Sequence, residues 1–146
     1  MTKRISRDEM FMRIAYVVAE RGTCPRAKVG AVLVDRDHKI RSIGYNGNPP
    51  GAPHCEDVGC MMKNGHCTAI HAEVNALMYG RFETGIYDTG YTLYVTHKPC
   101  EECKRVILKF NSKIKRVVYD IPYRYEGPED YEEGGVMFEK YKGPKV

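Results

Sequence analysis

The sequence lacks any apolar segment that approaches the roughly 20 residues needed for a membrane-spanning helix, so we expect no part of it to cross a bilayer. Its first six residues are charged and lack the apolar segment of a secretory signal peptide. These two absences argue against a membrane protein and against an exported one. We therefore expect a cytoplasmic protein.

The sequence also lacks a cluster of like charges. Its 23 Lys and Arg residues and 19 Asp and Glu residues give a formal net charge of +4, and the positive residues are scattered without interleaved aromatics. This distribution does not favour binding to polymeric nucleic acid and suits a small anionic ligand better. With 42% hydrophobic and 29% charged residues, the 146 residues fit one globular domain spanning 1–146.

Cysteine, by contrast, is abundant, with 6 residues in the chain. Without an export signal, this density favours metal or redox chemistry over a disulfide framework. Two of the cysteines lie in the segment Lys98–Cys103, which reads Lys-Pro-Cys-Glu-Glu-Cys. Upstream, the segment Ile70–Ala76 reads Ile-His-Ala-Glu-Val-Asn-Ala and contributes one histidine and one glutamate.

Together these two segments predict a catalytic zinc site. His71, Cys100 and Cys103 supply three ligands and leave a fourth tetrahedral position open, as catalytic zinc sites do. Glu73 is offset from the ligand and is free to move protons to and from an activated water. The Cys-x-x-Cys pair alone would also suit a redox pair, but His-x-Glu with Pro-Cys-x-x-Cys is the known signature of zinc nucleobase deaminases.

The hydrophobic periodicity predicts an α/β protein. Ser6 and Glu9 form a capping box before a helix over 7–21, a second helix covers 70–81, and Pro99 opens a third. Strands are predicted over 29–34, 40–45, 92–96 and 115–119, with a final edge strand over 136–138. This order predicts a layered α/β fold whose mixed sheet has roughly five strands, antiparallel at the first hairpin and parallel later. The tail over 126–146 is otherwise poorly readable, and 46–67 is a long irregular stretch.

Several further segments resemble the cytidine/deoxycytidylate deaminase superfamily and, within it, the deoxycytidylate (dCMP) deaminases. The resemblance covers about residues 5–125 and is carried by Thr23–Arg26, Lys28–Val32, Gly44–Gly47, His54–Cys55, Ile70–Ala76 and Tyr94–Cys100. It implies a three-layer cytidine-deaminase-like fold. It also implies zinc-dependent hydrolysis of dCMP to dUMP and ammonia in pyrimidine deoxynucleotide metabolism, with Glu73 carrying the protons.

The same resemblance implies a set of ligand contacts. Asn46 would hydrogen-bond the deoxyribose, the Ala72 backbone would contact the base, and Tyr123 would also contact the substrate. Candidates for phosphate or effector contacts are Arg26, Lys28, Gly44, Tyr45 and Gly47, with Lys98 and Arg124 as further cations. The resemblance further implies a homo-oligomer, commonly a hexamer, regulated by dCTP and dTTP, with Mg²⁺ accompanying the triphosphate.

The four remaining cysteines suggest a second, structural zinc site formed by Cys24, Cys55, Cys60 and Cys67. The spacing of the last three differs from common zinc fingers, and buried free thiols are the alternative. His54 or His66 could replace one of the four ligands. Some dCMP deaminases carry such a site in the matching region, where it would hold the loop close to Asn46.

Two alternative functions stay open. One is another zinc deaminase, acting on dCTP, free cytosine or tRNA adenosine. The other is a non-catalytic zinc-binding module, which would use the same ligands but would not need Glu73.

Overall fold

The computed structural model describes residues 3–24, 27–48, 51–53, 62–63, 66–67, 69–83, 85–122 and 127–146. The helices in these ranges are α1 (Arg7–Ala19), α3 (Ala72–Tyr79) and α4 (Glu101–Leu108). The strands are β1 (Gly30–Val34), β2 (Ile40–Tyr45), β3 (Met62–Lys63), β4 (His66–Cys67), β5 (Tyr91–His97), β6 (Ile114–Ile121), β7 (Tyr131–Glu133) and β8 (Val136–Lys140). Among the described residues, no helix is long and apolar enough to span a membrane.

Six of the strands form one mixed sheet in the order β2-β1-β5-β6-β8-β7. The pairs on either side of β1 are antiparallel, whereas β5, β6 and β8 run parallel to one another. β7 pairs antiparallel with β8 and forms the edge of the sheet opposite β2. α4 connects the parallel strands β5 and β6. It follows β5 in the chain, so the start of α4 lies at the end of the sheet where β5 ends.

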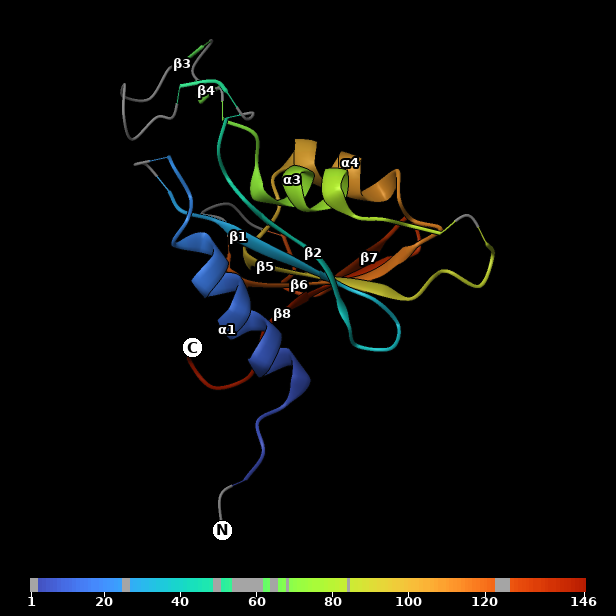
Figure 1. Ribbon diagram of the computed structural model, residues 1–146. Coiled ribbons are helices and arrows are strands. Elements are labelled where there is room, and N and C mark those ends of the chain that lie inside the picture. The colour runs from blue at the N-terminus through green and yellow to red at the C-terminus, as the bar shows by residue number, and fades with distance from the viewer. Residues whose placement is uncertain are drawn as a thin grey trace.

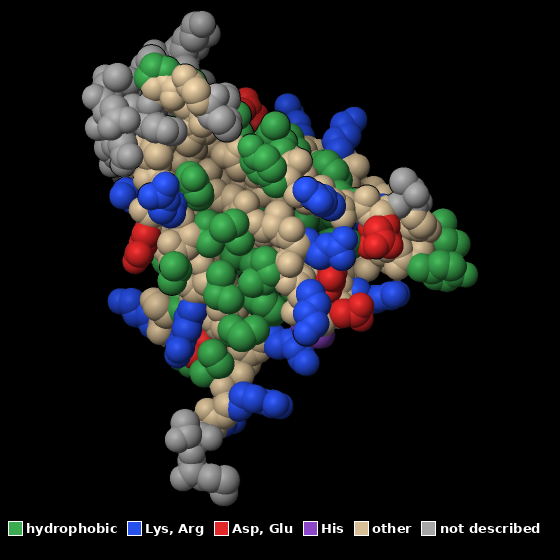
Figure 2. All heavy atoms as spheres, viewed as in Figure 1, with side chains coloured by type: hydrophobic (Ala, Val, Ile, Leu, Met, Phe, Trp, Pro, Cys, Tyr) green, Lys and Arg blue, Asp and Glu red, His purple; other side chains and the backbone are tan. Residues whose placement is uncertain are grey.

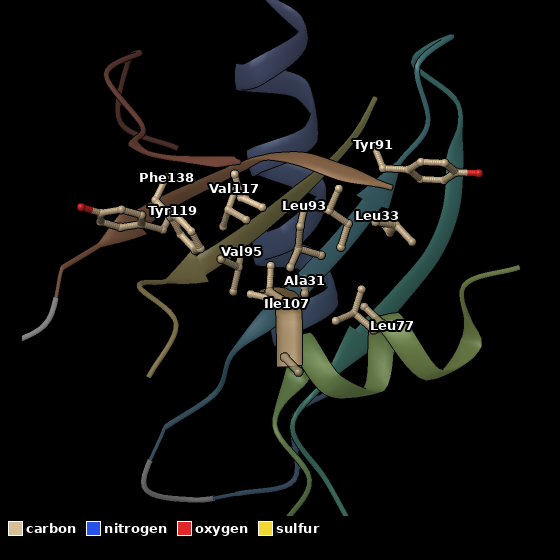
Figure 3. Close-up of a cluster of buried hydrophobic side chains, with 14 residues drawn as sticks. Ala31, Leu33, Leu77, Tyr91, Leu93, Val95, Ile107, Val117, Tyr119 and Phe138 are labelled. Atoms are coloured by element: carbon tan, nitrogen blue, oxygen red, sulfur yellow. The ribbon is translucent and has the colours of Figure 1, made fainter. Parts of the chain in front are cut away.

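The helices cover both faces of this sheet and so form three layers (Figure 1). α1 packs on one face, where Phe11 and Met12 join Val32, Tyr94 and Val118 in one buried cluster. α3 and α4 cover the other face with a larger cluster. Figure 3 shows Leu77 of α3 and Ile107 of α4 directed toward the side chains of the central strands, among them Leu93 and Val95. Burying apolar side chains on both faces is what holds the layers together.

Two glycines allow the helices to approach the sheet closely. A Cβ atom on Gly30 of β1 would lie 2.0 Å from the backbone oxygen of Ala15 in α1. A Cβ atom on Gly44 of β2 would lie 2.3 Å from the backbone oxygen of Ala72 in α3. Each glycine thus lets a helix rest directly on a strand, one on each face of the sheet.

The predicted fold class is confirmed, with six strands in the main sheet where roughly five were expected. Ser6 caps α1 as predicted, since its Oγ accepts a hydrogen bond from the Glu9 N–H at 3.0 Å. The helices are shorter than predicted, ending at Ala19 and spanning only Ala72–Tyr79. The prediction that Pro99 opens a helix was wrong: Cys100 is the N-cap of α4 and Pro99 precedes it.

Two segments differ from the sequence-based expectation because their strands pair in ways that local periodicity does not reveal. The tail contains both β7 and β8, and β8 lies inside the sheet between β6 and β7, so the prediction of an edge strand at 136–138 was wrong. Gly134 and Gly135 both have positive φ, which permits the tight turn between these two strands. In the stretch expected to be irregular, β3 and β4 form a short antiparallel ladder.

Candidate active site

The amino ends of α3 and α4 meet at one corner of the sheet. His71 is the N-cap residue of α3 and Cys100 is the N-cap residue of α4. The Cys100 Sγ accepts a hydrogen bond from the backbone N–H of Cys103 at 3.4 Å. Because helix amino ends carry partial positive charge, this corner favours thiolates and other anions.

The side chains of His71, Cys100 and Cys103 converge, and their ligand atoms all lie within 4.8 Å of one another. The His71 Nδ1 lies 3.1 Å from the Cys103 Sγ and 3.6 Å from the Cys100 Sγ. Zinc bonds of about 2.3 Å to sulfur and about 2.0–2.1 Å to nitrogen place N and S about 3.6 Å apart in a tetrahedron. The three side chains therefore fit a tetrahedral zinc ion and leave its fourth position open.

The three ligand residues already differ in their affinity for protons. Hydrogen bonds from Cys103 and then from His71 lower the pKa of the Cys100 thiol to about 3. The hydrogen bond with Cys100, followed by burial, raises the pKa of Cys103. The hydrogen bond with Cys100 also raises the pKa of His71. Cys100 is thus the thiolate of the pair, and a bound cation would displace the protons on the other two ligands.

Glu73 lies beside this cluster in the first turn of α3, and its side chain is buried at 4% exposure. Burial raises the pKa of Glu73, and a hydrogen bond with the Cys103 side chain opposes that shift. Among the described residues it is the buried carboxyl group next to the three ligands. A carboxyl group in such a place can accept and return a proton within the time of one reaction.

The backbone around His71 is fixed by residues at the end of β2 and just after it. Gly47 and Ile70 exchange two backbone hydrogen bonds, at 3.0 and 2.9 Å. The Asn75 Nδ2 donates to the backbone oxygens of Tyr45 at 2.8 Å and Ile70 at 3.3 Å. Asn75 therefore ties the first turn of α3 to the end of β2 and positions the segment that carries His71 and Glu73.

Asn46, the residue expected to bind deoxyribose, follows β2 directly and is 8% exposed. Its Oδ1 accepts from the Val29 N–H at 2.9 Å, and its Nδ2 donates to the Ala27 oxygen at 2.6 Å. A primary amide has two N–H groups and two lone pairs on oxygen. One donor and one acceptor of Asn46 thus hold the loop before β1, and among the described residues its amide has no hydrogen-bond partner beyond these two.

Of the other residues expected to contact a ligand, some are buried where helices and strands pack together and one is exposed on the surface. Ala72 and Gly44 are buried against each other where α3 meets β2, and Tyr45 packs against the α1 cluster. Gly47 is buried in the bridge to Ile70, and Lys28 is exposed. These positions give Gly44 and Gly47 a clear packing role, and contact with a ligand at any of them stays a prediction.

Part of the expected site lies outside the described residues. This applies to Arg26, Tyr123, Arg124, Cys55, Cys60 and His54, and to the side chains of His66 and Cys67. Cys24 is buried. The hydroxyl oxygen of the preceding residue, Thr23, is also buried and has no hydrogen-bond partner among the described residues. The ligand set of a second metal site stays a prediction.

Comparison with known proteins identifies the family to which this site belongs. Residues 5–121 match the sequence profile of the family described as the cytidine and deoxycytidylate deaminase zinc-binding region. The chain belongs to this family. This assignment accounts for the spacing of His71, Glu73, Cys100 and Cys103, which all lie within the matched residues.

Individual relatives extend over most of the chain. ComE operon protein 2 of Bacillus subtilis (strain 168) is 40% identical over 142 residues, which is 94% of this chain and 72% of that protein. The deoxycytidylate deaminase of Mycobacterium phage D29 is 42% identical over 124 residues, covering 77% of this chain and 92% of that protein. The dCMP deaminase of cyanophage S-TIM5, solved in complex with dCMP and dUMP, has a TM-score of 0.71 at 27% identity, covering 96% of this chain and 100% of that one.

Proposed function

We propose that this protein is a zinc-dependent dCMP deaminase, which hydrolyses dCMP to dUMP and ammonia. The observation that carries the proposal is the triangle of His71, Cys100 and Cys103 with the buried carboxyl group of Glu73 beside it. The phage relatives named as deaminases of this nucleotide, one of them solved with dCMP and dUMP, support dCMP as the substrate.

The chain's own residues supply binding and proton transfer. His71, Cys100 and Cys103 would hold the zinc ion, which when bound lowers the pKa of water and makes it a nucleophile at neutral pH. Glu73 accepts a proton from the attacking water and delivers it to the ring nitrogen beside the reacting carbon. It then carries the second proton to the departing amine, so that ammonia leaves and a carbonyl remains. Asn75 positions the segment that carries both His71 and Glu73.

The contacts inherited from the resemblance complete the proposal. The second N–H group and the second oxygen lone pair of Asn46 suit a deoxyribose hydroxyl, since among the described residues the amide makes one bond through each of its two atoms. The backbone of Ala72 lies at the start of α3 next to Glu73. Tyr123 is assigned to the substrate on resemblance alone. Four cations stay proposed for the phosphate: Arg26, Lys28, Lys98 and Arg124.

We also propose the finer features that the resemblance implies. These are a structural zinc at Cys24, Cys55, Cys60 and Cys67, regulation by dCTP and dTTP with Mg²⁺, and a homo-oligomer. A cytoplasmic location stays a prediction.

The test is ammonia release measured across dCMP, dCTP, deoxycytidine and cytosine, each with and without dCTP or dTTP as effector. We expect turnover with dCMP and much slower turnover with the other three. Preferred turnover of dCTP or cytosine would replace dCMP as the substrate and keep the zinc chemistry. No ammonia from any of the four by zinc-loaded protein would contradict the proposal.

A further inference from the structure

Two lysines flank the cysteine pair of the candidate zinc site, and both reach the same tyrosine ring. Lys98 stands two residues before Cys100, and Lys104 follows Cys103 directly. The Lys98 Nζ lies 5.3 Å from the centre of the Tyr131 ring, and the Lys104 Nζ lies 5.8 Å from it. At these distances each ammonium group is attracted by the negative face of the ring. One aromatic side chain thus joins the residues on both sides of the Cys-x-x-Cys segment.

Tyr131 belongs to the hairpin formed by β7 and β8, which lies outside the residues 5–121 that match the deaminase family. Its ring is stacked on Phe138 of β8, with the ring centres 4.9 Å apart and an angle of 3° between the planes. The Lys98 Nζ also lies 5.6 Å from the centre of the Tyr119 ring. Phe138 and Tyr119 are both fully buried. The ring that receives the two lysines is therefore held in place by the core.

Neither lysine is a fully solvated surface charge. Figure 2 shows Lys and Arg side chains spread over the surface on the face that it draws. Lys98, by contrast, is half-buried, and among the described residues it makes no ion pair with a carboxylate. The Lys104 side chain is 16% exposed and pairs with Glu101 at 3.0 Å and with Glu133 of β7 at 3.3 Å. Partial burial strengthens the attraction between an ammonium group and a ring, because less water competes for the charge.

Helix α4 depends on such contacts because it is short. It spans 8 residues, and its buried residues are Cys103 and Ile107. A helix of this length has little stability of its own and is positioned by its tertiary contacts. Just beyond its carboxyl end, the Asn111 Nδ2 donates to the Gly134 oxygen at 3.0 Å, in the turn of the same hairpin. The hairpin of β7 and β8 therefore contacts this segment near both of its ends.

We propose that Tyr131 is a positioning residue for the zinc ligands Cys100 and Cys103. It acts through Lys98 and Lys104, which fix the backbone on either side of the two ligands. Residues that orient ligands without touching the metal typically change metal affinity or activity by about 10–100-fold when they are replaced. The inference rests on the proposed zinc site and adds a support for it from outside the family match.

Lys98 is also one of the cations proposed for the substrate phosphate, and the two roles predict different results. Loss of a phosphate contact raises the KM for dCMP and leaves zinc affinity unchanged. Loss of a positioning contact weakens zinc binding and leaves the KM of the zinc-loaded protein unchanged. Removing a positive charge would by itself tighten the binding of a nearby cation, so weaker zinc binding reports position rather than charge.

The test is the zinc dissociation constant of the full chain, measured by competition with a chelator in the absence of substrate. Tyr131→Leu keeps an apolar side chain beside Phe138 but removes the ring, and it should raise the dissociation constant about tenfold or more. Tyr131→Phe is the matched control, because it keeps the ring and should bind zinc as the wild type does. Urea unfolding of both zinc-free variants shows whether they remain folded.

Lys98→Met is the second variant, because it leaves the stacked rings of the hairpin in place. It should raise the zinc dissociation constant about threefold or more, and Lys98→Arg, which keeps a cation for the two rings, should restore the wild-type value. Lys39→Met, the same change at an exposed lysine between β1 and β2, is the control and should bind zinc as the wild type does.

Wild-type zinc affinity in Lys98→Met would overturn the inference, whether or not its KM for dCMP rises. Wild-type affinity in a Tyr131→Leu variant that unfolds in urea like the wild type would overturn it equally. Because zinc binding is measured without substrate, neither result bears on the dCMP assignment, which the ammonia-release panel decides separately.

Discussion

The two faces of the sheet use polar groups in opposite ways. On the α1 face, charged side chains hold helix to sheet: the Arg116 guanidinium donates to both Asp8 carboxylate oxygens, at 2.9 and 2.7 Å, and to Glu139 at 2.9 Å. The Tyr94 hydroxyl adds a hydrogen bond to Asp8 at 2.6 Å. On the α3 and α4 face the buried cluster is mainly apolar, and the candidate metal ligands gather where the two helices begin.

Because of this difference, the charged groups on the α1 face stabilise the fold, whereas those at the start of α3 and α4 are available for chemistry. Asp8 and Arg116 are partners that satisfy each other's charge, and Arg116 lowers the pKa of Asp8. The Glu73 carboxyl group instead has the Cys103 side chain as a hydrogen-bond partner, and burial raises the pKa of Glu73. A carboxyl group with a satisfied charge stabilises the fold, whereas one held in an apolar site is available for proton transfer.

The largest combined effect, on zinc content and on turnover together, is expected from removing a ligand on the α3 face. His71→Ala should lower the zinc content by about one ion per chain and reduce dCMP turnover by at least about 100-fold, more than the loss of a residue that only supports a ligand. Lys109→Ala, an exposed change at the carboxyl end of α4, is the control and should keep both. Metal analysis and ammonia release are the measurements. Full zinc content in His71→Ala would exclude His71 as a ligand.

A matched pair of glycine substitutions tests whether packing on the α1 face affects catalysis on the α3 face. Gly30→Ala and Gly44→Ala each place a Cβ under 2.5 Å from helix backbone atoms, on the α1 face and the α3 face respectively. Each should lower the free energy of unfolding by about 1–3 kcal/mol through overpacking. Only Gly44→Ala displaces α3, the helix whose N-cap is His71, so it alone should lower kcat for the folded fraction.

Urea unfolding and steady-state kinetics on both variants provide the measurements. An equal fall in kcat for Gly30→Ala and Gly44→Ala would show that the two faces are coupled.

The smallest expected effect is the pH dependence of the unfolding free energy that arises from Asp8 and Arg116 on the α1 face. Arg116 lowers the pKa of Asp8 below its ordinary value of 3.8, so the pair stabilises the fold above pH 3.8 and loses that contribution as the pH falls toward the lower, folded-state pKa. The Asp8 side chain is 35% exposed, which limits the contribution to about 1 kcal/mol. Wild type and Asp8→Asn should therefore differ in unfolding free energy at pH 7 and converge below pH 3.8. A difference that persists unchanged at low pH would contradict this account.

The sequence was sufficient for the features that depend on local pattern. Ser6 and Glu9 marked the start of α1, and the apolar runs marked β1, β2, β5 and β6. The His-x-Glu and Cys-x-x-Cys spacings marked the groups that the structure brings together. Each of these signals lies within a few residues of the feature it predicts.

Features that depend on long-range pairing could not be predicted in this way. β8 is internal because it pairs with β6, and nothing in the sequence of residues 136–140 specifies that partner. Asn75 was visible in the zinc motif, but its role follows only from the position of the Tyr45 oxygen on β2. Gly44 likewise reads as an ordinary strand glycine until α3 is placed against it.

The most direct test of the account is to separate proton transfer from zinc binding with Glu73→Gln. Glutamine keeps the shape of the side chain but cannot accept and return a proton as a carboxylate does. We predict that the variant retains the zinc content of the wild type while its kcat for dCMP falls by about 10³-fold or more. Turnover near the wild-type rate in zinc-loaded Glu73→Gln would contradict the central claim that the buried carboxyl group on the α3 face carries the protons.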